Sequence, residues 1–322
     1  MFETLTLFVI GFFILIKGAD FLIDGATSVA RRLNISNWII GVTIVGIGTS
    51  IPEFSITFFD ALKGNAGIGL GTVIGSNTFN ILFILGLAAM ILPLSVKPTW
   101  VKKDLMINVY AVLVSALVAV FPIAGGDFFE ISKNEGWLLL ILLVVWIFYL
   151  IARNGSVRQE EPGNEFGLKI TAVPLSALMI IGGLVGVILG AEWVVRGGEI
   201  LAKTFGTSEA LIGLTVVGVG TSLPELVVSV EAARKGNVGI SLGNIVGSNI
   251  FDFLGILGVT AIVRNIPFPR ELVGDFMVTL GAAVLLLLAM FVGRKRYTLA
   301  RWQGLVFVLL YILYIITIGK IS

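Results

Sequence analysis

Apolar residues come along this chain in about ten blocks, each close to the roughly 20 residues that a helix needs to cross a bilayer. Short polar stretches separate the blocks, and the most polar of them is RNGSVRQEEPGNEFGLK at residues 153–169. We expect a first five-helix unit in residues 1–152, a linker at 153–169 and a second five-helix unit in 170–322. The pattern predicts an all-α membrane protein with helices near residues 3–25, 38–61, 67–92, 105–123, 136–152, 172–195, 209–232, 239–262, 273–292 and 302–319.

The two predicted units are related in sequence. A shift of 172 positions aligns residues 18–88 with residues 190–260 without a gap, and 31 of the 71 aligned positions are identical. The similarity indicates an internal duplication, in which Asp20 aligns with Glu192 and both are expected at solvated helix ends. Five helices per copy is an odd number, so the second copy must enter the membrane in the opposite direction. Inverted repeats are typical of secondary transporters, whose substrate site lies near the midplane where the repeats meet.

Basic residues predict the orientation of the chain, because cytoplasmic loops carry an excess of Lys and Arg. Among the basic residues assigned to loops, 14 lie on the side of the central linker and 7 on the opposite side. We therefore predict a multi-pass protein of the plasma membrane, with the linker in the cytoplasm and both termini extracellular. The apolar N-terminus lacks a basic region and a cleavage site, so we expect it to form the first spanning helix. Tryptophans at the predicted helix starts are expected in the interfacial belt: Trp38, Trp100, Trp137 and Trp302.

Composition narrows the chemistry that the chain can perform. Hydrophobic residues make up 57% of the chain and charged residues 13%, about half of the charged share of a soluble domain. The net charge of +2 argues against a nucleic-acid surface. Cysteine and histidine are absent, which removes thiolate and imidazole ligands and the usual proton carrier near neutral pH. A cation site must therefore use oxygen ligands, which suit Na⁺, Ca²⁺ or Mg²⁺, and we expect no cofactor and no obligate protein partner.

An intramembrane protease is the enzyme class that we weighed against a transporter. A serine protease needs a general base, and histidine is absent. An aspartyl protease needs paired aspartates on facing helices, whereas this duplication offers glutamates next to prolines. We therefore expect no enzyme. A cation channel stays open as an alternative, because channels and antiporters both use oxygen-lined sites.

Each repeat interrupts an apolar block with a helix breaker and a charge. The motifs read GIGTSIPE at Gly46–Glu53 and GVGTSLPE at Gly218–Glu225. Proline has no N–H, so Pro52 and Pro224 deprive a carbonyl four residues earlier of its helical partner, and the glycines permit unwinding and close approach. A bare carbonyl in hydrocarbon is costly unless something polar lies against it. The motifs also supply hydroxyls and carboxylates at the expected mid-membrane depth: Thr49, Ser50, Glu53, Thr221, Ser222 and Glu225.

A second pair of motifs follows in the next predicted helix of each repeat. They read GTVIGSNTFN at Gly71–Asn80 and GNIVGSNIFD at Gly243–Asp252. Ser76 and Asn80 are four residues apart, as are Ser248 and Asp252, and this spacing places each pair on one helix face. By the same geometry Asn77 and Asn249 are expected to point elsewhere and to bond between helices. Two glutamates, one aspartate, one asparagine and several hydroxyls therefore predict a site for a dehydrated Ca²⁺ or Na⁺.

At these residues the chain resembles the cation/Ca²⁺ antiporter superfamily, and within it the microbial Na⁺/Ca²⁺ exchangers. The repeats GTSIPE…GSNTFN and GTSLPE…GSNIFD carry the resemblance. It implies that Glu53 and Glu225 bind Ca²⁺ together with the carbonyls of Thr49 and Thr221. Asn80 and Asp252 would complete the central cluster, and their amide–acid asymmetry is similar to that of archaeal exchangers. Overlapping Na⁺ sites would also use Gly46, Ser50, Ser76, Gly218, Ser222 and Ser248.

The resemblance leaves the coupling ion open. The segments GTVIGSNTFNILFILG and ARKG are also similar to K⁺-dependent exchangers, but those carry an aspartate where Glu225 stands. Ca²⁺/H⁺ exchangers share the architecture and differ around the acidic motif. The resemblance therefore implies a secondary antiporter that exchanges Na⁺ for Ca²⁺ by alternating access, with H⁺ or K⁺ coupling as alternatives.

Overall fold

The computed structural model describes residues 2–63, 66–121, 127–153, 171–204 and 218–321. Within these ranges the fold is helical apart from four two-residue strands. Seven helices are long and apolar enough to cross a membrane, or eight if one bent pair counts as a single span. A shorter apolar helix covers Arg301–Thr317. The predicted all-α membrane fold is confirmed at this level, while the start of the predicted helix 209–232 and most of the linker lie outside the described residues.

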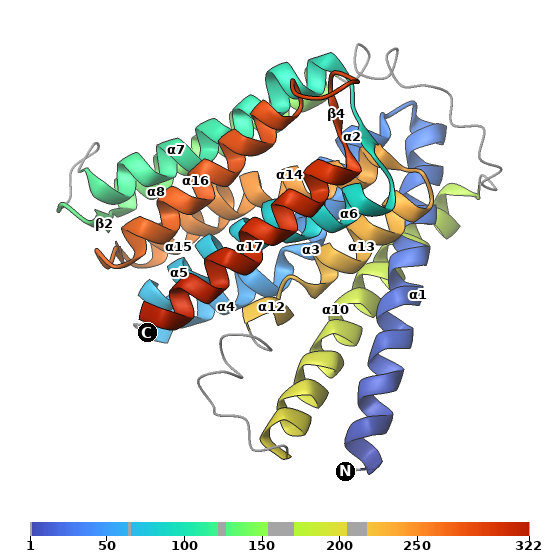
Figure 1. Cartoon of the computed structure of the whole chain (residues 1–322), viewed down its shortest axis with the longest axis horizontal. Helices are drawn as coiled ribbons and strands as arrows, with labels where there is room; N and C mark the ends of the chain where they lie inside the picture. Colours follow the sequence, from blue (N-terminus) through green and yellow to red (C-terminus); the bar gives the residue numbers. More distant parts are fainter. Residues whose placement is uncertain (1, 64–65, 122–126, 154–170, 205–217, 322) are drawn as a thin grey trace.

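The order of the elements repeats from the first half of the chain to the second (Figure 1). The first half contains α1 (Phe2–Leu33), α2 (Asn37–Ile40), η1 (Gly41–Val45), α3 (Gly46–Thr49), α4 (Ile51–Lys63), α5 (Ala66–Thr78), η2 (Phe79–Ile84), α6 (Leu85–Ile91), β1 (Leu94–Ser95), η3 (Trp100–Leu105), α7 (Met106–Val120), β2 (Glu130–Ile131) and α8 (Lys133–Ala152). The second half contains α10 (Val173–Thr204), α12 (Gly218–Gly220), α13 (Leu223–Arg234), α14 (Val238–Ile250), η5 (Phe251–Ile256), α15 (Leu257–Val263), β3 (Ile266–Pro267), α16 (Leu272–Ala289), β4 (Thr298–Leu299) and α17 (Arg301–Ile321). The η elements are π-helical turns.

The helices α1 and α10 lie side by side and extend away from the other helices (Figure 1). Each has 32 residues and continues well past the predicted ends near residues 25 and 195. Glycines bring the two backbones together, because a methyl group on Gly183 would lie 2.6 Å from the nitrogen of Leu22. A methyl group on Gly190 would lie 2.5 Å from the nitrogen of Leu15. Such close packing along the whole pair stabilises turns that hydrophobicity alone did not predict.

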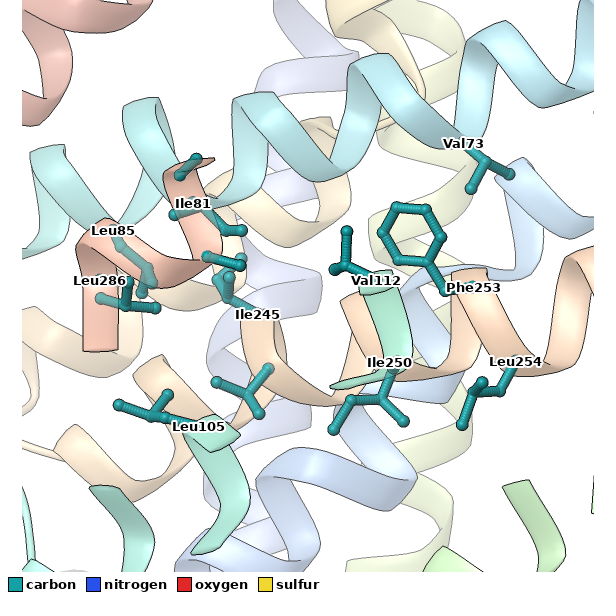
Figure 2. Close-up of a cluster of buried hydrophobic side chains, with 14 of the residues drawn as sticks. Val73, Ile81, Leu85, Leu105, Val112, Ile245, Ile250, Phe253, Leu254 and Leu286 are labelled. Carbon is teal, nitrogen blue, oxygen red and sulfur yellow. The ribbon is translucent and has the colours of Figure 1, made fainter. Parts of the chain in front are cut away.

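The centre of the protein is built from equivalent segments of the two halves. Within the span Val238–Val263, 83% of the residues in its most apolar window are buried, and within Gly69–Ile91 the share is 72%, against 28% for Val173–Gly198. Figure 2 shows part of this core, to which α5, η2, α6, α14 and η5 all contribute buried side chains. The labelled examples from these elements are Val73, Ile81, Leu85, Ile245, Ile250, Phe253 and Leu254. The motifs of both repeats therefore lie in the most enclosed part of the protein.

Two short antiparallel strand pairs join loops of the two halves. Leu94 of β1 pairs with Leu299 of β4, and Glu130 of β2 pairs with Pro267 of β3. Each pair satisfies backbone groups of connections that leave the helices. The outer helices α7, α8, α16 and α17 are thereby tied around the central segments.

The predicted tryptophan belt is only half right. Trp137 and Trp302 are each 56% exposed, as an interfacial position requires. Trp38 and Trp100 are buried instead, and their rings stack with centroids 4.5 Å apart. A helix start can therefore face the protein interior, and sequence position alone does not separate the two cases.

Candidate functional site

Both prolines lie just after a break in a helix. The helical path Asn37–Thr49 and Ile51–Lys63 bends by 45° at Ser50, whose φ and ψ are −79° and 5°. Ser222 has nearly the same geometry, with φ −91° and ψ 8°, between α12 and α13. The helical bonds resume with Phe54 N–H to the Ser50 carbonyl and Leu226 N–H to the Ser222 carbonyl, each at 3.0 Å. The predicted interruption is confirmed, but it falls at the serines and not at the glycines.

The glycines of the motifs serve close packing between elements. Gly46 lies inside a helix, and a methyl group there would be 2.9 Å from the Asn244 carbonyl oxygen and the Ser248 nitrogen of α14. Methyl groups on Gly48 and Gly220 would instead meet α10, at Leu184 and Val195 respectively. Gly46 therefore joins the two repeats, while Gly48 and Gly220 keep the break regions against α10.

The two glutamates pair crosswise with the serines of the opposite break. Ser50 Oγ donates to Glu225 Oε1 at 3.5 Å, and Ser222 Oγ donates to Glu53 Oε1 at 3.4 Å. Both glutamates are only 1% exposed. Within the described residues, the second carboxylate oxygen of each, Oε2, has no hydrogen-bond partner. Buried acceptors without a donor are costly in an apolar interior, so this arrangement favours a cation between the two glutamates.

Side chains of both repeats contact the Gly46 carbonyl. Ser248 Oγ donates to it at 3.0 Å, and Thr49 Oγ1 lies 3.2 Å from it. Thr49 Oγ1 also donates to Asn244 Oδ1 at 3.0 Å, and Asn244 Nδ2 reaches the Glu225 carbonyl at 3.3 Å. Thr49, Ser248 and Gly46 were expected at the site, whereas Asn244 was missed. Asn244 could have been identified from its place in the motif GNIVGSNIFD, because a buried side-chain amide there needs hydrogen-bond partners.

Asn80 and Asp252 each lie in a π-helical turn, η2 and η5, at equivalent positions of the repeats. Asn77 donates to Asp252 Oδ2 at 2.9 Å, and Asn80 donates to Asn249 Oδ1 at 3.2 Å. Asn77 and Asn249 do bond between helices as predicted, but the expectation that they point away from the central cluster is wrong. A π-helical turn widens the helix and changes its register, so a spacing argument based on α-helical geometry fails there.

The other predicted residues are placed less centrally. Ser76 Oγ bonds to the Val73 carbonyl of its own helix at 3.1 Å. Thr221 is partly buried beside the second break and lines a cavity. Gly218 begins α12, directly after residues that are outside the described range. The structure thus brings most of the predicted set together, while it gives Ser76 a local partner.

Three carboxylates dominate the charge of this region. Glu53, Glu225 and Asp252 are each 1% exposed, and in the part of the chain that the structure describes no Lys or Arg forms a salt bridge with them. No group of three or more acidic side chains among the described residues is arranged to hold a metal ion by itself. A bound cation would therefore need hydroxyl, amide and carbonyl oxygens as well, a mixed donor set that suits Ca²⁺ or Na⁺.

A cavity of about 510 Å³ reaches the two breaks from one side of the protein. It lies between α10 and the starts of α4 and α13, with Pro52, Ser55, Thr221 and Pro224 in its wall. Glu192 and Arg196 of α10 also line it and form a salt bridge with each other. The α10 residues in its wall lie between Ile188 and Arg196, well away from the linker end of the helix at Val173.

On the linker side, Lys235 ties α1 to the core. Its Nζ lies 3.0 Å from Asp20 Oδ1 and 2.8 Å from Asp24 Oδ1, while Asn237 donates to Thr27 at 3.0 Å. Asp20 therefore lies in the interior of α1 and forms an ion pair with Lys235. The expectation that it lies at a solvated helix end is wrong. Burial lowers the pKa of Lys235, but the hydrogen bonds and charges of Asp24 and Asp20 outweigh burial and hold the pKa above its ordinary value. Lys235 therefore keeps its positive charge throughout the neutral pH range.

Known proteins match nearly the whole chain. The family described as sodium/calcium exchanger protein matches residues 4–152 and 175–320. An uncharacterized membrane protein of Methanocaldococcus jannaschii is 34% identical over 306 residues, covering 95% of each chain. The sodium/calcium exchanger MaX1 of Methanosarcina acetivorans is 29% identical over 347 residues, covering 96% of each. A structure of the sodium-calcium exchanger NCX_Mj soaked with Na⁺ and Ca²⁺ aligns with a TM-score of 0.81 at 33% identity, covering 97% of each chain. With this coverage, the buried glutamates and the paired helix breaks lie in a chain that belongs to the sodium/calcium exchanger protein family.

Proposed function

We propose that this protein is a secondary antiporter that exchanges Na⁺ for Ca²⁺ at the site around Glu53 and Glu225. The crosswise pairing of the two glutamates with Ser222 and Ser50 carries the proposal. It leaves one oxygen of each carboxylate without a partner in the described structure. Two glutamates balance the charge of one Ca²⁺, while Na⁺ ions spread over the same carboxylates and neighbouring hydroxyls. The site therefore holds Ca²⁺ or Na⁺, and this competition couples the two fluxes.

The ligand set proposed for these ions follows the repeats. Ca²⁺ binds Glu53 and Glu225 with the carbonyls of Thr49 and Thr221, and Asn80 and Asp252 complete the centre. The contacts of Thr49 and Ser248 with the Gly46 carbonyl support a second, hydroxyl-rich part of the site. The proposed Na⁺ ligands also include Gly46, Ser50, Ser76, Gly218, Ser222 and Ser248.

The proposed membrane organisation has ten helices in two inverted five-helix repeats. The repeats comprise residues 1–152 and 170–322, and residues 153–169 form a cytoplasmic linker. The excess of basic residues on the linker side supports this orientation, which places both termini outside the cell in the plasma membrane. The matching breaks at Ser50 and Ser222 support the relation between the repeats.

Alternating access follows from the position of α1 and α10 beside the core. The cavity along α10 approaches the site from the side opposite the linker, and the ion pairs of Lys235 hold α1 against α13 on the linker side. Movement of the α1–α10 pair across Gly48 and Gly220 would close the cavity and break the Lys235 contact. The structure thus supports a state in which the site is open to the outside. In this state the ion pairs of Lys235 keep the cytoplasmic side closed.

The variant Lys235→Ala should shift the protein away from this state. Partly exposed ion pairs contribute about 0.2–1 kcal/mol each, so losing two changes the balance of states by about two- to thirtyfold. The chain has no cysteine, so a single Ser55→Cys in the cavity wall reports opening through labelling by a membrane-impermeant thiol reagent. We expect slower labelling in the Lys235→Ala background.

The neighbouring Arg234→Ala is the matched control for this prediction. Arg234 pairs with Glu231 of its own helix and is 65% exposed, so its loss should leave labelling unchanged. Equal labelling rates in all backgrounds would show that Lys235 does not stabilise the outward-open state.

The function is tested by Ca²⁺ uptake into proteoliposomes preloaded with Na⁺. Parallel vesicles carry only a proton gradient, only K⁺, or no gradient. We expect uptake that requires internal Na⁺ and is insensitive to a proton ionophore. Uptake that follows the proton gradient would identify a Ca²⁺/H⁺ exchanger. Uptake that requires K⁺ would identify a K⁺-dependent exchanger, and uptake without any counter-ion would identify a channel.

A further inference from the structure

A groove lies on the outer surface of the protein between α7 and α8. Its volume is about 260 Å³, and η5 forms its floor through Leu254. Tyr110 of α7 and Val145 of α8 line it and are 53% and 58% exposed. The groove therefore opens outward from spanning helices, which in a bilayer means toward lipid.

Each wall of the groove is a stripe of one helix. The stripe of α7 consists of Ile107, Tyr110 and Val114, and the stripe of α8 consists of Leu142, Val145 and Tyr149. Spacings of three and four residues keep such side chains on one helix face. The two walls are apolar over most of their length, with tyrosines as their polar exceptions.

Both stripes end in a basic residue at the same end of the groove. Lys102 and Lys103 lie in the π-helical turn η3 just before the α7 stripe, and Arg153 lies one turn after Tyr149. The salt bridge of 2.7 Å between Arg153 and Asp104 shows that these two helix ends lie together. The Arg153 guanidinium lies over the Tyr149 ring, 5.0 Å from its centroid, and so borders the groove. Asp104 neutralises the charge of Arg153, so the exposed Lys102 and Lys103 give this end of the groove a net positive charge.

The α7 stripe together with the lysines before it spans about one leaflet. From Lys103 to Val114 the helix rises by about 16 Å, which is about half of the roughly 30 Å hydrocarbon core. An apolar channel of this length with a cationic end suits a molecule that has a hydrocarbon tail and an anionic head.

We propose that this groove binds one anionic phospholipid from the leaflet on the linker side. One acyl chain lies between α7 and α8 over Leu254, and the phosphate accepts hydrogen bonds from the exposed Lys102 and Lys103. This inference does not depend on which ions the protein exchanges, because the groove is separate from Glu53 and Glu225.

Native mass spectrometry of the full chain in detergent tests the proposal, with phosphatidylglycerol and phosphatidylcholine added in equal amounts. We expect one phosphatidylglycerol bound in preference to phosphatidylcholine. The variant Lys103→Gln should weaken that binding by about fivefold, which corresponds to the roughly 1 kcal/mol per basic residue near an anionic surface. Lys133→Gln should change it less than about twofold, because Lys133 is equally charged and exposed but lies at the start of α8, away from this end of the groove.

A second pair of variants tests the tail. Val145→Trp fills the groove and should reduce the bound lipid, while Val144→Trp, at an exposed neighbour outside the groove, should not. Melting temperatures of all four variants should equal that of the wild type, so that lost binding does not reflect unfolding. Equal effects of Lys103 and Lys133, equal effects of Val144 and Val145, or no headgroup preference would overturn the proposal. Lipid displaced by dimer formation would assign the groove to a second copy of the chain.

Discussion

We expect Ca²⁺ exchange to be lost when either Glu53 or Glu225 is replaced by glutamine, while the protein stays folded. Each change keeps the shape of the side chain and removes the charge that would face the cation. Breaking a buried charge pairing costs about 3–5 kcal/mol, so Ca²⁺ affinity should fall at least about a hundredfold. Without bound ion, the variant has one fewer buried charge, and its melting temperature should not fall.

Two measurements separate lost binding from lost folding. Ca²⁺ should raise the melting temperature of the wild type, since a ligand that binds only the folded state stabilises it, and this rise should vanish in both variants. Glu231→Gln on the same helix as Glu225 is the control, because Glu231 pairs with Arg234 near the helix end and should retain both exchange and the thermal shift. Retained exchange in both Glu53→Gln and Glu225→Gln would contradict the proposed site.

The variant Gly247→Ala should destabilise the protein and disrupt the site. A methyl group at Gly247 would lie 2.2 Å from the Val42 carbonyl oxygen and 2.6 Å from its carbonyl carbon. These are backbone atoms of η1 and cannot rotate away, so α14 and η1 must separate. Overpacking of this kind costs about 1–3 kcal/mol, which lowers the melting temperature by several degrees. The separation would also move Gly46 and Thr49 away from Ser248, so exchange should fall with stability.

Gly281→Ala on α16 is the matched control for Gly247→Ala. Among the described residues, no heavy atom lies within 4 Å of a methyl group built there. Alanine is favoured over glycine in a helix by up to about 1 kcal/mol, so stability should stay the same or rise. A Gly247→Ala protein as stable as the Gly281→Ala protein would show that the contact between α14 and η1 adapts easily.

Much of the local structure follows from the chain alone. Pro52 and Pro224 cannot donate a backbone hydrogen bond, and both helices break just before them, at Ser50 and Ser222. The apolar blocks likewise predict where helices form, because a bilayer requires about 20 apolar residues for each span. The ends of α1 and α10 were missed, and beyond the predicted end of α10 Gly197 packs closely against Phe8 of α1.

The amino-acid sequence by itself determined the membrane class, the duplicated motifs, the presence of a break in each motif and the inventory of oxygen ligands. Only the tertiary structure decided which of these groups meet: Ser50 with Glu225, Ser222 with Glu53, and Asn77 with Asp252. Each of these pairs joins residues more than 160 positions apart, and none follows from the spacing within either motif. Spacing specifies the backbone conformation of a single segment, whereas contacts between repeats depend on how closely glycine faces let the helices approach and on where π-helical turns alter their register.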